Sequence, residues 1–191
     1  AITMLCCFEG TLGIYQGEEL GLTDTNLAFE ELTDPVGLKF WPDNKGRDGC
    51  RTPMVWDGSA NAGFSNGDPW LPVKPPQASR NVAALESDPG SVLHHCRRVL
   101  AWRRSEPLLR RGRTVFLDLP EPVLGFHRRD GGAALTCVFN LSSKPMTLDA
   151  PGAAITGPQH AALDGTRLAL PGNGFACLRG PGDGVAVSVA G

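Results

Sequence analysis

Glu18 and Glu19 are the first residues whose type and spacing suggest chemistry. Cleavage of a glycosidic bond needs two carboxyl groups that face one bond from opposite sides, about 5–10 Å apart. Neighbouring side chains on an extended chain point to opposite faces, so this pair can flank one substrate only where the backbone turns sharply. We therefore expect Glu18 and Glu19 to organise a loop, as acceptors for backbone N–H groups or for arginine, and we assign them no catalytic role.

A second polar cluster lies at residues 47–57, with the sequence RDGCRTPMVWD. Arg47 and Arg51 are four residues apart, and Asp48 follows Arg47 directly. Bidentate guanidinium–carboxylate pairs could hold such a loop together. Alternatively, one arginine points into a site and binds a sugar hydroxyl or an acidic neighbour. The spacing alone favours the structural role.

Other familiar catalytic patterns are absent from the sequence. It has no nucleophile elbow, no P-loop and no dinucleotide fingerprint. The four histidines lack ligand-spaced partners, and the six cysteines, at 6, 7, 50, 96, 137 and 177, show no CxxC spacing. We therefore expect no metal, no cofactor and no assembled catalytic set, and we expect the cysteines to act as small buried hydrophobes.

Composition excludes several classes of partner. The formal net charge is −2, so there is no basic field over the whole chain that would attract nucleic acid. Seven arginines between residues 97 and 113 have no interleaved aromatics, which favours a solvated helix face over an RNA contact. No apolar run of about 18 residues is present, so we expect no membrane span. The absence of a cysteine framework weakly favours a reducing compartment, and we expect a cytoplasmic protein.

The elements that would position these residues begin with two short apolar segments. Residues 1–9 indicate the tail of a buried helix, and residues 11–16 indicate a strand buried on both faces, as in a parallel sheet. A chain that begins inside a core segment suggests that an upstream part precedes it. Residues 21–90 show no period, and we expect a functional loop. Trp41, Trp56 and Trp70 would anchor this loop.

The second half of the chain changes character. Asp88-Pro89-Gly90-Ser91 opens a helix that Pro107 ends. Short runs then indicate strands at 114–119, 123–129, 133–141, 144–149, 167–170 and 174–179. Strands this short, with turn residues between them, predict an antiparallel sandwich. The preceding strand–loop–helix is typical of the closing unit of an alpha/beta barrel.

Two motifs carry a resemblance to a known family. Gly10–Leu22 (GTLGIYQGEELGL) resembles the eighth barrel strand of glycoside hydrolase family 13, the alpha-amylase superfamily, and in particular its oligo-1,6-glucosidase and alpha-glucosidase group. The RDxxRTPMxWD pattern of 47–57, followed by NAGFS at 61–65 and PWL at 69–71, resembles the loop before the eighth helix of the same group. Leu12 and Leu22 replace the usual proline and methionine.

The resemblance implies a fold and a division of the chain. Residues 1–107 would be the last β/α unit of a TIM-type (β/α)8 barrel, with strand 8, a long loop and helix 8. Residues 108–182 would be an antiparallel β-sandwich domain, and 183–191 a tail. The family's nucleophilic aspartate, acid/base glutamate and second aspartate belong to strands 4, 5 and 7, upstream of residue 1, so no catalytic residue is expected here.

The resemblance also implies one substrate contact. Arg47 matches the first arginine of the family motif, which binds the non-reducing-end glucose in exo-acting members. The expected parent enzyme is a retaining alpha-glucosidase acting on short alpha-glucosides, completed by the N-terminal part of the same barrel and inactive as this fragment alone. Alternatives are a glucosyl-transferring or isomerising relative of the trehalose synthase or sucrose-acting type, and a non-catalytic scaffold homologue.

Overall fold

The computed structural model describes residues 1–180 and 182–190, which form two compact units. We call Ala1–Leu12 with Arg98–Gly191 the terminal unit, and Gly13–Arg97 the loop unit. The helices are α1 (Ile2–Cys7), α2 (Pro35–Phe40), α3 (Pro75–Ala78), α4 (Val82–Glu86), α5 (Val92–Ser105) and α6 (Pro107–Arg111), with 3-10 turns η1 (Glu18–Leu20), η2 (Phe29–Glu31), η3 (Asp48–Cys50) and η4 (Ala60–Gly63). The strands are β1 (Arg113–Phe116), β2 (Val123–Asp130), β3 (Ala133–Asn140), β4 (Met146–Asp149), β5 (Ala154–His160), β6 (Ala162–Asp164), β7 (Arg167–Leu170), β8 (Phe175–Arg179) and β9 (Ser188–Val189).

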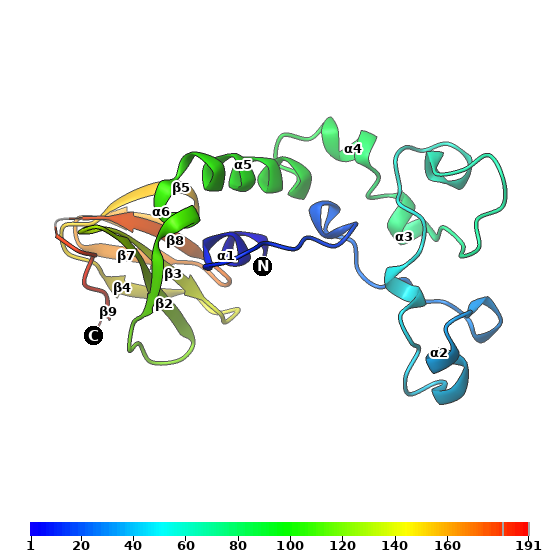
Figure 1. Cartoon of the computed structure of the whole chain (residues 1–191), viewed down its shortest axis with the longest axis horizontal. Coiled ribbons are helices and arrows are strands. Elements are labelled where there is room, and N and C mark those ends of the chain that lie inside the picture. Colours follow the sequence, from blue (N-terminus) through cyan, green and yellow to red (C-terminus); the bar gives the residue numbers. More distant parts are fainter. Residues whose placement is uncertain (181, 191) are drawn as a thin grey trace. The chain divides into compact units, whose positions relative to one another are not determined.

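The terminal unit is built on two antiparallel sheets (Figure 1), as the sequence predicted. One sheet has the order β1-β2-β3-β8-β5 and the other β6-β7-β4-β9. The hairpin between β2 and β3 pairs Asp130 with Ala133 across Gly131 and Gly132, which both have positive φ. A two-residue turn of that conformation matches the twist of the flanking strands, which explains why Asp-Gly-Gly signals the hairpin so clearly.

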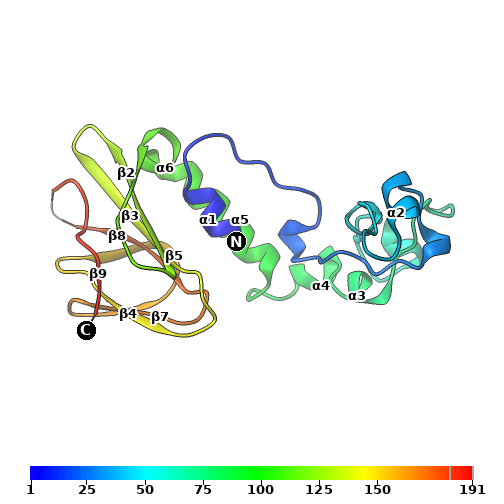
Figure 2. The same ribbon diagram turned by 90° about the horizontal axis from the view of Figure 1, so that it is seen from below.

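The central strands of the five-stranded sheet, β2, β3 and β8, are buried on both faces. Toward the second sheet, Val138, Ala176 and Leu178 pack against the apolar side chains of β4 and β7. On the other face, Phe126, Leu135 and the neighbouring apolar side chains pack against α1 and α6. Figure 2 shows α1 and α6 on this side of the sheet. Burial of both faces explains why β3 is a nearly continuous apolar run, and it confirms the buried helix expected at residues 1–9.

Three strands, β5, β6 and β9, were not predicted. β5 contains Gly157 and Pro158, which interrupt a strand pattern, and its pairing with β8 shifts register between Thr156 and His160. Proline is tolerated there because β5 is an edge strand. Gly157 has φ +70 and lies under the Trp102 ring, where a Cβ would be 2.2 Å from the ring. β9 lies within residues 183–191, which the sequence analysis expected to be a tail. The expected domain limits, at residues 107/108 and 182/183, stay a prediction.

The strand expected at residues 11–16 does not form, and this expectation was wrong. These residues pair with no described segment, and Ile14 and Tyr15 are 36% and 51% exposed. A parallel strand needs neighbours that supply its hydrogen bonds, and no described residue of this chain supplies them. The segment therefore lies exposed, although its sequence is typical of a buried strand.

The loop unit holds its fold with little regular structure. Its two small apolar clusters are centred on Leu20 with Val55 and on Leu27 with Leu71. Trp41 packs against the second cluster, as expected of an anchor. Trp56 and Trp70 do not, because they are 50% and 60% exposed. Polar contacts must therefore supply much of the order in this unit.

None of the helices formed by the described residues has the length and apolar character that crossing a bilayer requires.

Candidate functional site

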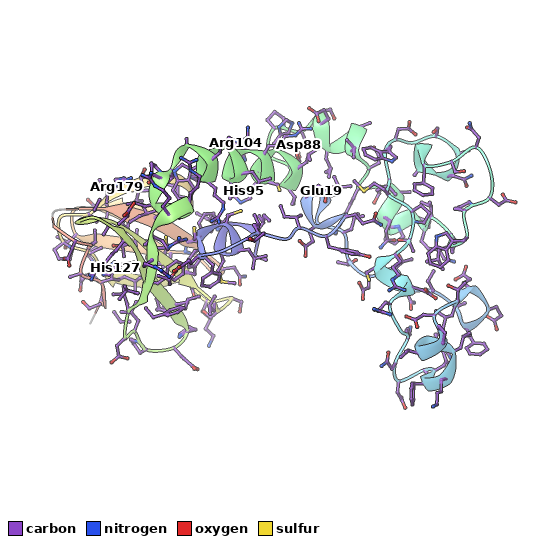
Figure 3. The ribbon with its side chains drawn as sticks, viewed as in Figure 1. Glu19, Asp88, His95, Arg104, His127 and Arg179 are labelled. Carbon is purple, nitrogen blue, oxygen red and sulfur yellow. The ribbon has the colours of Figure 1, made fainter. Side chains whose placement is uncertain are left out.

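The GIYQGEEL segment turns sharply at Gly17. Gly17 has φ +92, and a Cβ there would lie 2.8 Å from the side chain of Leu22. The backbone N–H of Gly17 donates to Glu19 Oε2 at 2.8 Å, and that of Tyr15 donates to Glu18 Oε2 at 3.2 Å. Figure 3 labels Glu19 on this turn. Both carboxylates thus accept main-chain N–H groups of their own turn, which supports the loop-organising role.

Asp48 holds two loop segments together. Its side chain is fully buried. Its Oδ2 accepts the backbone N–H groups of Thr33 and Asp34 at 2.6 and 2.7 Å, and the Thr33 hydroxyl donates to Oδ1 at 3.2 Å. Hydrogen bonds to an ionised acceptor are among the stronger ones in proteins, so one carboxylate fixes residues 33–34 beside η3.

Asp34, which sequence reasoning did not select, has a matching role. Its Oδ1 accepts the N–H of Val36 and caps α2, and its Oδ2 accepts the N–H of Arg47 at 2.9 Å. The Arg47 N–H, more than that of Val36, lowers the pKa of Asp34 below its usual value, and the charges of Arg47 and Arg51 add to the effect. The signal in the sequence was Asp34-Pro35, a helix cap followed by proline at the first helical position.

Arg47 is fixed at its backbone and free at its tip. Its side chain is 71% exposed, and Nε lies 3.7 Å from Asp34 Oδ2. Among the described residues its guanidinium makes no further ion pair or hydrogen bond. No bidentate pair of the kind considered from the sequence forms at Arg47 or Arg51 within the described part of the chain. Carboxylates bound to main-chain N–H groups organise the loop instead.

The two sequence motifs meet at one cavity of about 210 Å³. The Gln16 amide donates to the Thr52 carbonyl at 3.4 Å, and the hydroxyls of Thr25 and Thr52 are 3.1 Å apart. A further main-chain bond joins Thr25 N–H to Gly49 O at 2.9 Å. Residues that are 24 to 36 positions apart in sequence therefore form a single wall.

The lining of this cavity suits binding better than bond cleavage. It includes the Gln16 amide, the Glu18 carboxylate and the Thr52 hydroxyl, all of which can bind a polar ligand. Its one thiol, Cys50, donates to the Arg47 carbonyl at 3.1 Å, and no histidine is among the lining residues. Of the lining carboxylates, Glu18 already accepts a main-chain N–H group of its own turn, which favours a structural or binding role over a catalytic one.

One group of residues in the described part of the chain could hold a metal, and it lies outside the loop unit. It consists of Cys7, Cys137 and Cys177, all buried. No spacing pattern in the sequence indicates this group, because the three cysteines are separated by 130 and 40 residues.

Comparisons of the chain with known proteins all point to one family. A family model described as "Alpha amylase, catalytic domain" matches residues 1–112. A probable alpha-glucosidase of Rhizobium meliloti (strain 1021) is 48% identical over 149 residues, covering 78% of this chain and 27% of the relative. An oligo-1,6-glucosidase of Parageobacillus thermoglucosidasius is 33% identical, covering 74% and 29%.

Solved structures agree with this match. The crystal structure of the alpha-glucosyl transfer enzyme XgtA superposes with a TM-score of 0.87 at 42% identity, covering 94% of this chain and 34% of that one. An isomaltulose synthase mutant from Erwinia rhapontici NX5, in complex with D-glucose, gives a TM-score of 0.79 at 26% identity, covering 93% and 37%. The chain thus spans between 27% and 37% of the length of these relatives.

Proposed function

The chain belongs to the alpha-amylase family, and we propose on that basis that it forms the end of a retaining alpha-glucosidase. The family match over residues 1–112 identifies the end of the (β/α)8 barrel, and an antiparallel β-sandwich domain follows it, as expected, although residues 11–16 form no strand in this chain. The proposed reaction is hydrolysis of terminal alpha-glucosidic bonds in disaccharides or short oligosaccharides. In such a reaction one carboxylate attacks the anomeric carbon, and a carboxylic acid protonates the leaving oxygen and then activates water.

The observation that carries this proposal is the joining of the two motifs at one wall. The segments GIYQGEEL and RDGCRTPM line one cavity, and a hydrogen bond from Gln16 to Thr52 joins them. The carboxylates of Asp34 and Asp48, which we call the frame, bind main-chain N–H groups and hold the second segment in place. The nearby relatives named alpha-glucosidase and oligo-1,6-glucosidase support the substrate class.

Arg47 is the proposed substrate contact. Its backbone N–H is held by Asp34 while its guanidinium remains largely exposed. An exposed guanidinium presents several N–H donors to sugar hydroxyls. The catalytic carboxyl groups are proposed to come from the N-terminal part of the same barrel, and the site needs no cofactor from this segment.

The proposed location is the cytoplasm. None of the six cysteines, all of which the structure describes, forms a disulfide, which supports a reducing compartment.

The test is an assay of the chain alone and joined to the rest of its barrel. The joined protein should hydrolyse p-nitrophenyl alpha-glucoside and release the alpha anomer of glucose first, as read by proton NMR; the chain alone should show no turnover. Release of the beta anomer, or turnover by a clean preparation of the chain alone, would contradict the proposal.

Glucosyl transfer is the second candidate, favoured by the 42% identity to an alpha-glucosyl transfer enzyme. Incubation with maltose and an alcohol acceptor separates the two: hydrolysis yields mainly glucose, and transfer yields mainly glucosylated acceptor. Absence of both products would favour a non-catalytic scaffold.

A further inference from the structure

Three cysteines from distant parts of the chain converge inside the terminal unit. Cys7 ends α1, and Cys137 and Cys177 are directly paired across β3 and β8. The Sγ atoms of Cys7 and Cys177 are 3.7 Å apart, and those of Cys137 and Cys177 are 3.5 Å apart. All three sulfurs lie within 4.8 Å of one another, and none of the three residues is exposed.

These separations suit one metal ion bound by three sulfurs. Three thiolates about 2.3 Å from a common ion have sulfurs roughly 3.8 Å apart at tetrahedral angles and about 4.0 Å apart at trigonal angles. The two distances to the Cys177 sulfur, 3.7 and 3.5 Å, are up to about half an ångström shorter than these values, and Cys7 and Cys137 lie within 4.8 Å of each other, so a small shift of the side chains would admit the ion. No disulfide links any of the three.

A buried cation beside the cluster lacks a carboxylate partner. Arg128 is fully buried, and its guanidinium donates to the carbonyls of Cys7 at 2.5 Å and Gly112 at 2.5 and 3.2 Å. Within the described residues no Asp or Glu forms an ion pair with it, although the charge of Glu9 acts on it from a greater distance. Burying a charge without a counter-charge in contact is expensive, so the site favours negative charge nearby.

The thiols can supply that charge. The Arg128 guanidinium donates to the Cys7 carbonyl, so a thiolate formed at Cys7 would have a positive charge close by. The thiolate is the form that binds metal. A complex of three thiolates with a monovalent or divalent cation remains anionic, so Arg128 also stabilises the loaded state.

We propose that Cys7, Cys137 and Cys177 form a three-sulfur site for a thiophilic d¹⁰ cation of the Cu(I) class, with Arg128 as its charge partner. Soft thiolate sulfurs select such ions. Structural zinc sites take four ligands, and the described residues provide three. Binding releases the remaining thiol protons to solvent and ties α1 to β3 and β8, so the ion should stabilise the terminal unit.

The test is an anaerobic titration of the purified, folded chain with Cu(I), in competition with bicinchoninate. One Cu(I) should bind per chain, and X-ray absorption at the copper edge should count three sulfur ligands. The site should be lost in Cys137→Ala and retained in Cys50→Ala, the matched control with an exposed thiol. Failure to compete for copper, binding that survives Cys137→Ala, or binding abolished by Cys50→Ala would overturn the proposal.

A second measurement needs no variant. At free Cu(I) about 100-fold above its Kd, the unfolding midpoint of the chain should rise by on the order of 10 °C. A midpoint that does not move with copper, in a chain that unfolds cooperatively, would equally overturn the proposal.

Discussion

The terminal unit and the loop unit stabilise their folds by different means. In the terminal unit, strand ladders and apolar side chains fill both faces of a five-stranded sheet. In the loop unit, the apolar clusters are small, and buried carboxylates such as Asp48 bind main-chain N–H groups. Anchoring a loop through its backbone leaves side chains such as Arg47 free, whereas a sheet core uses its side chains for packing. A ligand-binding wall is therefore better built from loops that are anchored through their backbone than from the side chains of a sheet core.

The largest expected effect comes from the terminal unit. Leu178→Ala removes a fully buried side chain between the sheets and should lower the free energy of unfolding by about 3 kcal/mol. Urea unfolding followed by far-UV circular dichroism measures this loss. Leu141→Ala, at a 56% exposed side chain, is the control and should change stability by less than about 0.5 kcal/mol. Equal losses for the two substitutions would contradict the claim that apolar burial between the sheets stabilises the terminal unit.

The next effect is polar and belongs to the loop unit. Asp48→Ala leaves the N–H groups of Thr33 and Asp34 without their acceptor and should cost about 2–3 kcal/mol. Tryptophan fluorescence is a suitable probe, because three of the four tryptophans lie in this unit. Leu38→Ala, at a 43% exposed apolar side chain, should cost far less. A larger loss for Leu38→Ala would show that apolar packing dominates here too.

The smallest expected effect is a difference in pH dependence. Burial, followed by the charge of Arg129, lowers the pKa of His127 in β2, whose position Figure 3 labels. The unfolded chain then binds the proton more tightly, so stability of the terminal unit should fall as pH drops through about 6.5, the unfolded value. Asp34 has a lowered pKa, so its contribution to the loop unit is lost only at more acidic pH, below its unfolded value.

Two variants separate these pH windows. His127→Gln should flatten the stability slope between about pH 5 and 7, and Asp34→Asn should flatten the slope below about pH 4. Thermal unfolding at a series of pH values provides the measurement. An unchanged slope in either variant would assign that window to other groups.

Sequence reasoning succeeded where local patterns are strong. The helix after Asp88 and its end before Pro107 were predicted, as were the strands flanking Gly131 and Gly132, because capping, proline and turn chemistry act locally. β5 was missed because Gly157 and Pro158 hide an edge strand whose conformation depends on Trp102.

The candidate site was predicted through its motifs and not through its contacts. Of Arg47, Asp48, Glu18 and Glu19, which were selected from the sequence, only Glu18 is among the residues that line the cavity. The role of Asp34 emerged only when residues 34 and 47 met in space. The cluster of Cys7, Cys137 and Cys177 likewise became visible only in the folded chain, because no spacing rule links these three positions. Residues 11–16 show the converse: a strand pattern without a pairing partner forms no strand.

The most direct test of the account is Arg47→Ala in the protein that joins this chain to the rest of its barrel, compared with Arg51→Ala. If Asp34 and Asp48 hold the frame while Arg47 contacts substrate, Arg47→Ala should lower kcat/KM for maltose about 100-fold and leave the unfolding midpoint within about 1 °C of the parent. A parallel loss of activity and of unfolding midpoint would instead make Arg47 part of the frame and contradict its role as the substrate contact.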